Sequence, residues 1–283
     1  MKIQHILAGI DFEKQTGRIL AYASLFAQDF QASLHLLHVI DYLVTPPAYL
    51  DQYIEKEKSS AEEKLATIQR ELAGSGIGVN STVLVGRLQA SFETALQKTG
   101  ADLLVLGFAS HGFRRSSSEK LIKGLQMPML VVRGKKSETA SAGNISIRRI
   151  LCPVDFSDSS KQALGISREL ARTFSSEIEV MHVLQESAMK KIKVRGAKKE
   201  AMRKIYEREK SRLEDILTAS SFDSRGIMEQ GEPYKRIVSF AKEEDIDLLV
   251  MGARGLGFIK GMLIGSVTDA VLKSAPCPVF VIH

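Results

Sequence analysis

A chain of 283 residues with 44% hydrophobic and 25% charged residues has the composition of a globular protein and the length of two domains. No apolar run approaches the roughly 18 residues that cross a bilayer, and the first residues enter a strand pattern without the layout of a signal peptide. These features argue against a membrane-spanning or secreted protein, so we expect a cytoplasmic one.

The first half of the chain alternates between short apolar runs and segments with helical periodicity. The helical segments carry small and apolar residues near positions 20–27, 65–72 and 92–96. Nearly continuous apolar strands that alternate with helices predict a parallel sheet covered on both faces. The expected strands span residues 3–10, 33–40, 79–85, 102–107 and 128–133.

The second half repeats the first. Residues 150–156 (ILCPVDF) match residues 6–12 (ILAGIDF), and residues 247–252 (DLLVMG) match residues 102–107 (DLLVLG). Several such blocks in the same order, at offsets of 144 or 145 residues, indicate a duplicated domain rather than a short solenoid repeat. The corresponding strands span residues 148–154, 177–184, 224–230, 247–252 and 278–282.

Two such copies predict an α/β protein of two tandem, doubly wound, five-stranded parallel-sheet domains with right-handed crossovers. The segment 134–144 is polar and small, as in a linker. We therefore expect a first domain over 1–134, a linker over 135–147 and a second domain over 148–283. Ligands bind such sheets at the carboxyl ends of the strands, near the point where the strand order reverses.

A glycine-rich loop follows the fourth strand of the second copy, with the sequence GARGLGFIKGMLIGSVT over residues 252–268. Glycines at the strand end, in the loop and at the start of the next helix allow a close approach of backbone to ligand. The loop is neither a Walker A motif nor a dinucleotide fingerprint. By itself it has a plain alternative, a flexible connection with a serine helix cap.

The full set of motifs resembles the ATP-binding branch of the universal stress proteins. Gly252, Gly255 and the pair Gly265-Ser266 have that family's nucleotide-loop spacing, and residues 150–155 followed by Ser157 resemble its opening strand. His182-Val183 and Cys277-Pro278-Val279 match as well, so the resemblance covers both halves of the chain. It implies a Rossmann-like, adenine nucleotide alpha hydrolase-like fold for each domain.

The resemblance also implies which residues hold the nucleoside. Asp155 would accept a hydrogen bond from a ribose hydroxyl, although it could equally cap the helix that follows. Val183 would meet adenine through its backbone groups. The remaining residues of this part line the base pocket or pass under the ribose: Pro153, Val154, Met251 and Gly252.

The implied phosphate site lies between the loop and the following helix. Arg254 departs from the small or imidazole residue expected there, and both a phosphate contact and a solvent-facing position stay open for it. Main-chain amides and hydroxyls would surround the phosphates at Gly255, Gly265, Ser266, Val267 and Thr268. The predicted cofactor is ATP, and an accompanying Mg²⁺ ion is left open.

The first copy has a degenerate version of this loop over residues 107–118. It is five residues shorter before the closing helix, Ser110 replaces Gly255, and Arg115-Ser116 stands where Gly265-Ser266 would. Gly9 also replaces Pro153. We therefore predict that only the second copy binds ATP.

The function predicted from these residues is regulatory: nucleotide occupancy shifts a conformational or association equilibrium in a stress response. The alternative is a slow ATPase or an ATP-dependent transferase. Phosphoryl transfer needs metal ligands and a positioned nucleophile, but the carboxylates near the loop are sparse, namely Asp155 and Asp269. No catalytic residue is predicted, and slow hydrolysis is left open.

Partners are predicted more coarsely. We expect the two copies to pair within one chain, and leave open a homodimer through exposed edge strands and an unidentified protein partner. The basic residues between 190 and 204 are read as a solvated helix face, with nucleic acid or a membrane surface as a disfavoured alternative. His38 and His182, at equivalent strand ends, and the thiols of Cys152 and Cys277 are interpreted as structural.

Overall fold

The structure is a computed structural model, which describes residues 1–41, 50–74, 76–108, 117–133, 145–185, 195–219, 223–256 and 263–283. The chain divides into two compact units, Met1–Ile145 and Ser146–His283. Residues 135–144 of the linker predicted at 135–147 lie outside the described residues, as do residues 109–116 of the shortened loop of the first copy, Gly257 and the basic residues at 190–194.

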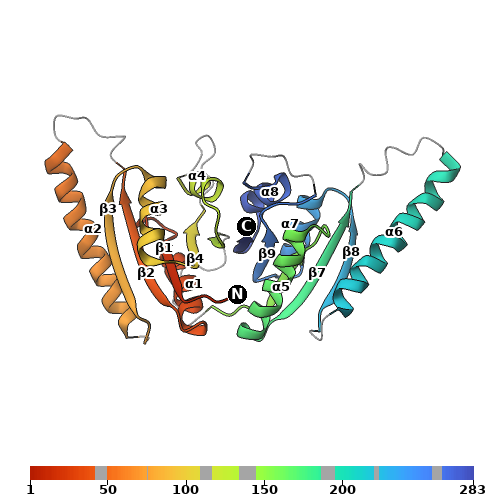
Figure 1. Cartoon of the computed structure of the whole chain (residues 1–283), viewed down its shortest axis with the longest axis horizontal. Helices are drawn as coiled ribbons and strands as arrows, with labels where there is room; N and C mark the ends of the chain where they lie inside the picture. The colour runs from red at the N-terminus through yellow and green to blue at the C-terminus, as the bar shows by residue number, and fades with distance from the viewer. Residues whose placement is uncertain are drawn as a thin grey trace. The chain divides into compact units, whose positions relative to one another are not determined.

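The first unit is a five-stranded parallel sheet in the order β3-β2-β1-β4-β5 (Figure 1). Its elements follow one another as β1 His5–Gly9, α1 Thr16–Asp29, β2 Ser33–Ile40, α2 Leu50–Ala73, β3 Val79–Val85, α3 Leu88–Thr99, β4 Leu103–Gly107, α4 Ser117–Gly124 and β5 Met129–Val132.

The second unit repeats the topology in the order β8-β7-β6-β9-β10. Its elements are β6 Arg149–Pro153, α5 Asp158–Phe174, β7 Glu177–Leu184, α6 Arg195–Thr218, β8 Arg225–Gln230, α7 Pro233–Glu243, β9 Leu248–Gly252, α8 Ser266–Ser274 and β10 Val279–Ile282.

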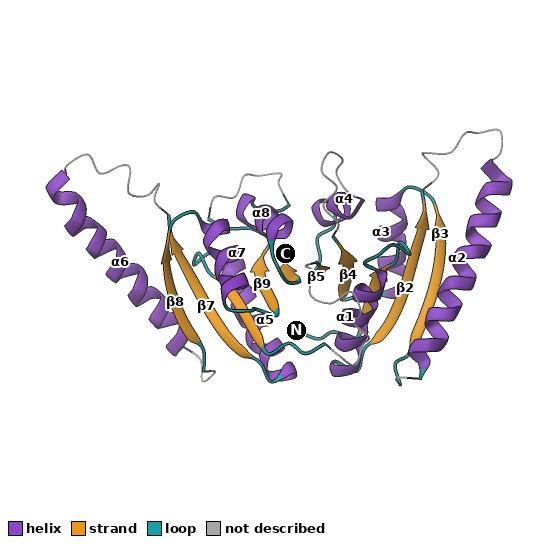
Figure 2. Ribbon diagram, turned by 180° about the vertical axis from the view of Figure 1, so that it is seen from behind, coloured by secondary structure: helices purple, strands orange, loops and turns teal. Residues whose placement is uncertain are grey.

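The fold class predicted from the apolar runs is confirmed, because each unit has five parallel strands within a few residues of the expected ranges. The central strands are buried along nearly their whole length, and helices pack against both faces of each sheet. Figure 2 shows the same alternation of purple helices and orange strands in both units. The order of strands reverses between β1 and β4 and between β6 and β9, which places the switch point at equivalent positions.

Both cysteines are free and buried, as expected. Burial raises the pKa of the Cys152 thiol to about 12, which outweighs a hydrogen bond with Ser167 and the charge of Arg168. Cys152 is therefore a neutral core side chain at physiological pH and not a nucleophile. Among the residues that the structure describes, no helix combines the length and the apolar character needed to cross a bilayer.

Candidate functional site

The switch point of the second unit brings together two segments that lie 101 residues apart in the sequence. Asp155 follows β6, and its Oδ2 accepts a hydrogen bond of 2.8 Å from the amide of Leu256, in the loop after β9. Its Oδ1 accepts from the amide of Ser157 at 3.1 Å and from the Ser157 hydroxyl at 2.5 Å. The carboxylate therefore fastens the glycine-rich loop to the end of β6.

The cap of α5 is Ser157 and not Asp155, the residue for which the sequence also allowed this role. Ser157 has an extended backbone, and its Oγ accepts the amide of Ser160 at 3.3 Å. Asp155 instead orients this cap through the hydroxyl of Ser157. One oxygen of Asp155 thus serves the α5 terminus, while the other faces the loop after β9.

The environment of Asp155 lowers its pKa below the ordinary value of 3.8. Burial acts in the opposite direction, but the hydrogen bonds from Ser157, Leu256 and Ser160 to the charged form outweigh it. The side chain is therefore an anion at neutral pH. A carboxylate oxygen has more than one lone pair, so Oδ2 can accept a further donor beside the amide of Leu256.

We expect Asp155→Asn to lower the free energy of unfolding by about 2 kcal/mol at pH 7, because hydrogen bonds to a charged group are lost. The folded-state pKa lies below the unfolded one, so this contribution is complete above about pH 3.8 and disappears as the pH falls through the folded value. Denaturant unfolding of both proteins from pH 7 to 3 measures the difference.

The matched control for that change is Asp11→Asn in the first unit. Asp11 is exposed, and its Oδ1 accepts from the amide of Glu13 at 2.9 Å and the hydroxyl of Thr16 at 3.2 Å. Its removal should cost less than that of Asp155. A loss in Asp155→Asn that stayed constant down to pH 3 would contradict the assigned ionic contacts.

The three glycines that define the loop differ in the reason for having no side chain. A Cβ at Gly252 would collide with Ser159, and one at Gly255 would collide with Oδ2 of Asp155. Among the described residues, a Cβ at Gly265 would come nearest to the oxygen of Ala253 at 3.5 Å, with Cα of Arg254 and the nitrogen of Gly255 at 3.7 Å, all ordinary contact distances. Backbone atoms therefore require glycine at 252, a side chain at 255 would displace the Asp155 carboxylate, and the described residues make no such demand at 265.

The N-terminus of α8 is the part of the site to which the resemblance assigns the phosphates. Gly265 occupies the cap position with φ −71° and ψ 156°, and no side chain caps the helix. The amide of Gly265 donates to the oxygen of Ala253 at 2.7 Å, which holds the helix start against the end of β9. The next two residues are exposed at Ser266 and half-buried at Val267. Their amides are the donors that a helix leaves unused at its first turn.

Thr268, which the resemblance assigns to the phosphates, fastens the start of α8 through its side chain. It is buried, and its hydroxyl donates to the carbonyl of Gly252 at 2.9 Å, which fastens α8 to β9. Arg254 is half-buried. The burial of His283 lowers the pKa of this histidine to about 4, and the positive charge of Arg254 adds to the effect. The guanidinium therefore lies near the end of β10, and a phosphate contact from it stays a prediction.

The residues predicted to line the base pocket lie at the ends of β6, β7 and β9. Val154 is buried, and its amide donates to the oxygen of Met181 at 2.8 Å. Its own oxygen accepts from Nδ1 of His182 at 2.8 Å, which confirms the structural interpretation of this histidine. The remaining predicted residues of this part are also buried: Pro153, Val183 and Met251.

The first unit fills the corresponding region with side chains. Phe108 stands where the second unit has Ala253, and Gln15 stands where it has Ser159. Nε2 of Gln15 donates to the carbonyl of Phe108 at 3.2 Å, and the guanidinium of Arg133 lies 5.5 Å from the Phe108 ring centre. Gly9, which replaces Pro153, is covered by Phe92 and Leu106. These contacts support the prediction that the first copy is not a nucleotide site.

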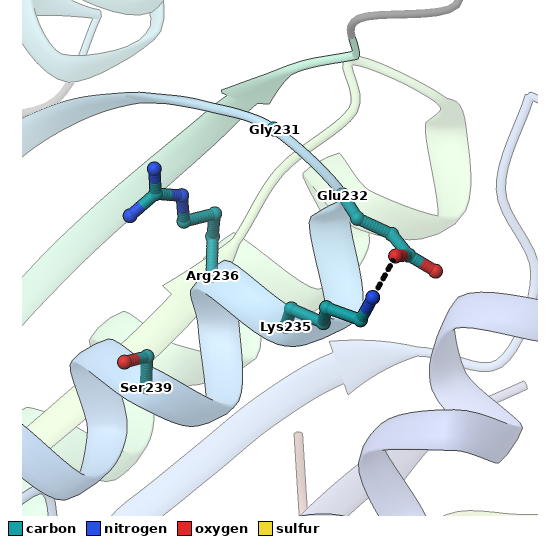
Figure 3. A pocket seen from close by; sticks show the side chains of 5 residues that line it. All are labelled: Gly231, Glu232, Lys235, Arg236 and Ser239. Carbon is teal, nitrogen blue, oxygen red and sulfur yellow. Dashed lines mark ion pairs between the residues drawn. The ribbon is translucent and has the colours of Figure 1, made fainter.

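Two surface pockets lie away from this site. One, of about 420 Å³, is formed by the end of β8 and the start of α7, and Figure 3 shows its side chains. Its cations are already engaged, because Lys235 pairs with Glu232 at 2.7 Å and Arg236 donates to the oxygen of Gln230 at 2.8 Å. The other, of about 560 Å³, lies at the amino ends of the strands, around Arg149 and Glu179.

The last residue of the basic stretch, and basic residues that follow it on α6, form ion pairs within that helix. Within α6, Lys204 pairs with Glu200, and Arg212 pairs with Glu209, each with a partner on the same helix. Such pairs are typical of a solvated helix face, as the sequence suggested. The basic residues of the stretch that precede α6, from 190 to 194, lie outside the described part of the chain.

Comparison with known proteins agrees with this architecture. The family model "Universal stress protein family" matches residues 2–133 and 146–283. Universal stress protein MJ0577 of Methanocaldococcus jannaschii is 30% identical over 49% of this chain and 96% of its own length. Universal stress protein YxiE of Bacillus subtilis is 29% identical over 48% of this chain and 98% of its own.

A solved structure extends the likeness to the whole chain. The crystal structure of a universal stress protein from Archaeoglobus fulgidus has a TM-score of 0.74, with 21% identity, over 99% of this chain and 96% of its own. At that identity the likeness shows the fold. The tandem arrangement is therefore shared with a solved protein along the full described sequence.

Proposed function

The chain belongs to the universal stress protein family, and from this premise we propose that its second unit binds ATP and that occupancy regulates a cytoplasmic stress response. In this proposal the nucleoside lies against Asp155, Val154 and Val183, and the phosphates face the start of α8. The first unit is proposed to carry no nucleotide.

The observation that carries the proposal is the pairing of an anion with an open helix terminus at one switch point. Asp155 is ionised, half-buried and tied to the loop after β9, which makes it a fixed acceptor for a ribose hydroxyl. The start of α8 offers amides and a positive dipole end without a capping side chain. One acceptor and one anion site at the same sheet edge match the two ends of a nucleotide.

The remaining predicted residues fit the same placement. Gly255 keeps the backbone close to Asp155, since a side chain there would occupy the space of its carboxylate. Ser266 is exposed at the first turn of α8 and can add a hydroxyl donor. A bound Mg²⁺ ion would be carried mainly by the phosphates, as is usual for this metal.

A regulatory role is favoured over catalysis by the two carboxylates nearest the loop. Asp155 is engaged by Ser157 and Leu256, and Asp269 pairs with Lys273 at 2.8 Å on its own helix. These contacts occupy both carboxylates and do not aim either of them as a general base at an attacking water. A slow ATPase or ATP-dependent transferase remains the second candidate, and a phosphate-release assay distinguishes it.

The direct test is the identity and the stoichiometry of nucleotide on the purified chain. Extracted ligand is identified by mass spectrometry, and calorimetric titration compares ATP with ADP, cyclic AMP and GTP. We expect one equivalent of adenine nucleotide per chain, because the loop of the first copy is shorter and lacks the glycines that correspond to Gly255 and Gly265. Two equivalents would contradict the reading of the first unit, and none would contradict the whole proposal.

The association state belongs to the same proposal. Pairing of the copies within a chain, or of two chains through edge strands, predicts a mass of one or two chains by light scattering. If ATP acts as a regulator, it must bind one state more tightly than the other. A mass or a conformational exchange rate that changes with ATP would therefore identify the equilibrium that it controls.

A further inference from the structure

An aromatic ring next to Asp155 is held between a histidine and an arginine from another helix. Phe156 follows Asp155 and has φ 65°, a left-handed conformation that is unfavourable for a residue with a side chain. Its buried ring lies 4.5 Å from the ring of His182, centre to centre. On α6, the guanidinium carbon of Arg212 lies 4.1 Å from the Phe156 ring centre. We call Arg212, Phe156 and His182 the Phe156 column.

The column adjoins three residues of the proposed nucleotide site, namely Val154, Asp155 and Val183. The carbonyl of Val154 can only accept, so Nδ1 of His182 carries the proton in their 2.8 Å hydrogen bond. The column therefore fixes the backbone on both sides of Asp155, at Val154 through His182 and at Phe156 through the ring contacts. Val183, assigned to adenine, follows His182 directly.

Arg212 is itself held in place on α6. Its Nη1 donates to Oε2 of Glu209 at 2.8 Å, while Oε1 of Glu209 takes a hydrogen bond of 2.6 Å from Arg208. Glu209 is only 6% exposed, although most residues of α6 around it are exposed or half-buried. A buried carboxylate that orients Arg212 makes the cation a fixed support for the ring rather than a mobile surface charge.

The first unit contains an equivalent column of Phe12, His38 and Lys64. Phe12 has φ 59°, its ring lies 4.6 Å from that of His38, and Lys64 of α2 lies 5.1 Å from the Phe12 ring centre. Nδ1 of His38 bonds to the oxygen of Ile10 at 2.7 Å. The chain thus holds an internal control, in which the same contacts stabilise a unit that is proposed not to bind nucleotide.

We propose that Arg212 is a positioning residue for nucleotide binding: through Phe156 it holds the turn that aims the Asp155 carboxylate at the ribose and at the amide of Leu256. It touches no ligand itself. The inference rests on the proposed ATP site in the second unit. If Arg212 has this role, a partner that binds α6, or a change of charge on that helix, alters the affinity for ATP.

The test compares matched variants of the two columns in the full chain. Arg212→Met keeps the length of the side chain but removes the charge, and we expect about five- to tenfold weaker ATP binding by calorimetry. Arg212→Lys should restore affinity to within about twofold, because the cation over the ring is retained. Lys64→Met should destabilise the first unit and leave ATP affinity unchanged.

A second readout separates positioning from stability alone. Hydrogen exchange of the Leu256 amide, which Asp155 holds, should become faster in Arg212→Met and stay unchanged in Lys64→Met. Phe156→Leu, with Phe12→Leu as its control, should repeat the pattern. Wild-type ATP affinity in every Phe156-column variant that folds would overturn the inference while leaving the proposed function intact. A wild-type chain that binds no ATP would overturn the proposed function itself.

Discussion

Gly265→Val is expected to abolish ATP binding, with at least about a hundredfold weaker affinity, while the second unit remains folded. The backbone at this position has φ −71° and ψ 156°, which valine adopts readily. Among the described residues, the atom nearest to the new Cβ is the oxygen of Ala253 at 3.5 Å, which is an ordinary contact distance. It would instead occupy the approach to the amides of Ser266 and Val267.

Calorimetric titration with ATP measures the affinity, and thermal unfolding by circular dichroism measures the fold. Replacing a glycine cap by valine should cost about 1 kcal/mol of helix stability, which is small beside the loss of binding. Gly265→Ala, with a smaller side chain at the same place, should give an intermediate affinity. A folded valine variant with wild-type affinity for ATP would contradict the assignment of the phosphates to this helix.

Gly252→Ala is expected to produce the opposite outcome, a destabilised second unit, by about 3 kcal/mol. A Cβ at Gly252 would lie 2.8 Å from the carbonyl carbon and 2.9 Å from the carbonyl oxygen of Ser159, and would also meet its hydroxyl. Because two of these atoms belong to the backbone of α5, no rotamer change relieves the clash. The helix must move away from β9, and the buried contacts between them are lost.

The matched control is Gly107→Ala, at the equivalent position of the first unit. There the Cβ would meet the ends of two flexible side chains, Cδ1 of Ile19 at 2.8 Å and Oε1 of Gln15 at 3.1 Å. These can rotate, so the loss should be about 1 kcal/mol.

Calorimetry or circular dichroism is the suitable measurement of both losses, since the chain has no tryptophan. Ser159→Gly should not rescue Gly252→Ala, because it removes only the side chain and leaves the carbonyl of residue 159 in place. A Gly252→Ala chain as stable as the wild type would show that α5 and β9 are not packed this closely.

The pairing of these variants shows why a glycine pattern is an incomplete guide to a binding site. Gly252 and Gly265 are equivalent in a motif, since both belong to the spacing that resembles the nucleotide loop. Gly252 is packed against α5, whereas Gly265 is the cap residue of α8. A motif records that a side chain is absent, whereas packing decides whether the fold or the ligand needs the space.

The same distinction applies to the residues that sequence reasoning overlooked. Ser159 and Leu256 carry no motif signal, because one acts through its backbone against Gly252 and the other through an amide that Asp155 accepts. The capping role of Ser157 could have been found from its place two residues after Asp155 and just before a helical pattern. No sequence pattern indicates the contact between Arg212 and Phe156, since the two residues lie 56 positions apart.

The sequence by itself determined the duplication, the ten strands, the fold class and the family resemblance, because these depend on periodicities and spacings that are local in the chain. Only the tertiary structure decided how Asp155, Thr268 and Gly252 are used. Hydrogen bonds and close contacts between distant segments depend on how helices pack on a sheet, to within a fraction of an ångström. A linear pattern contains no such distance, so the chemistry of this site follows from packing rather than from composition.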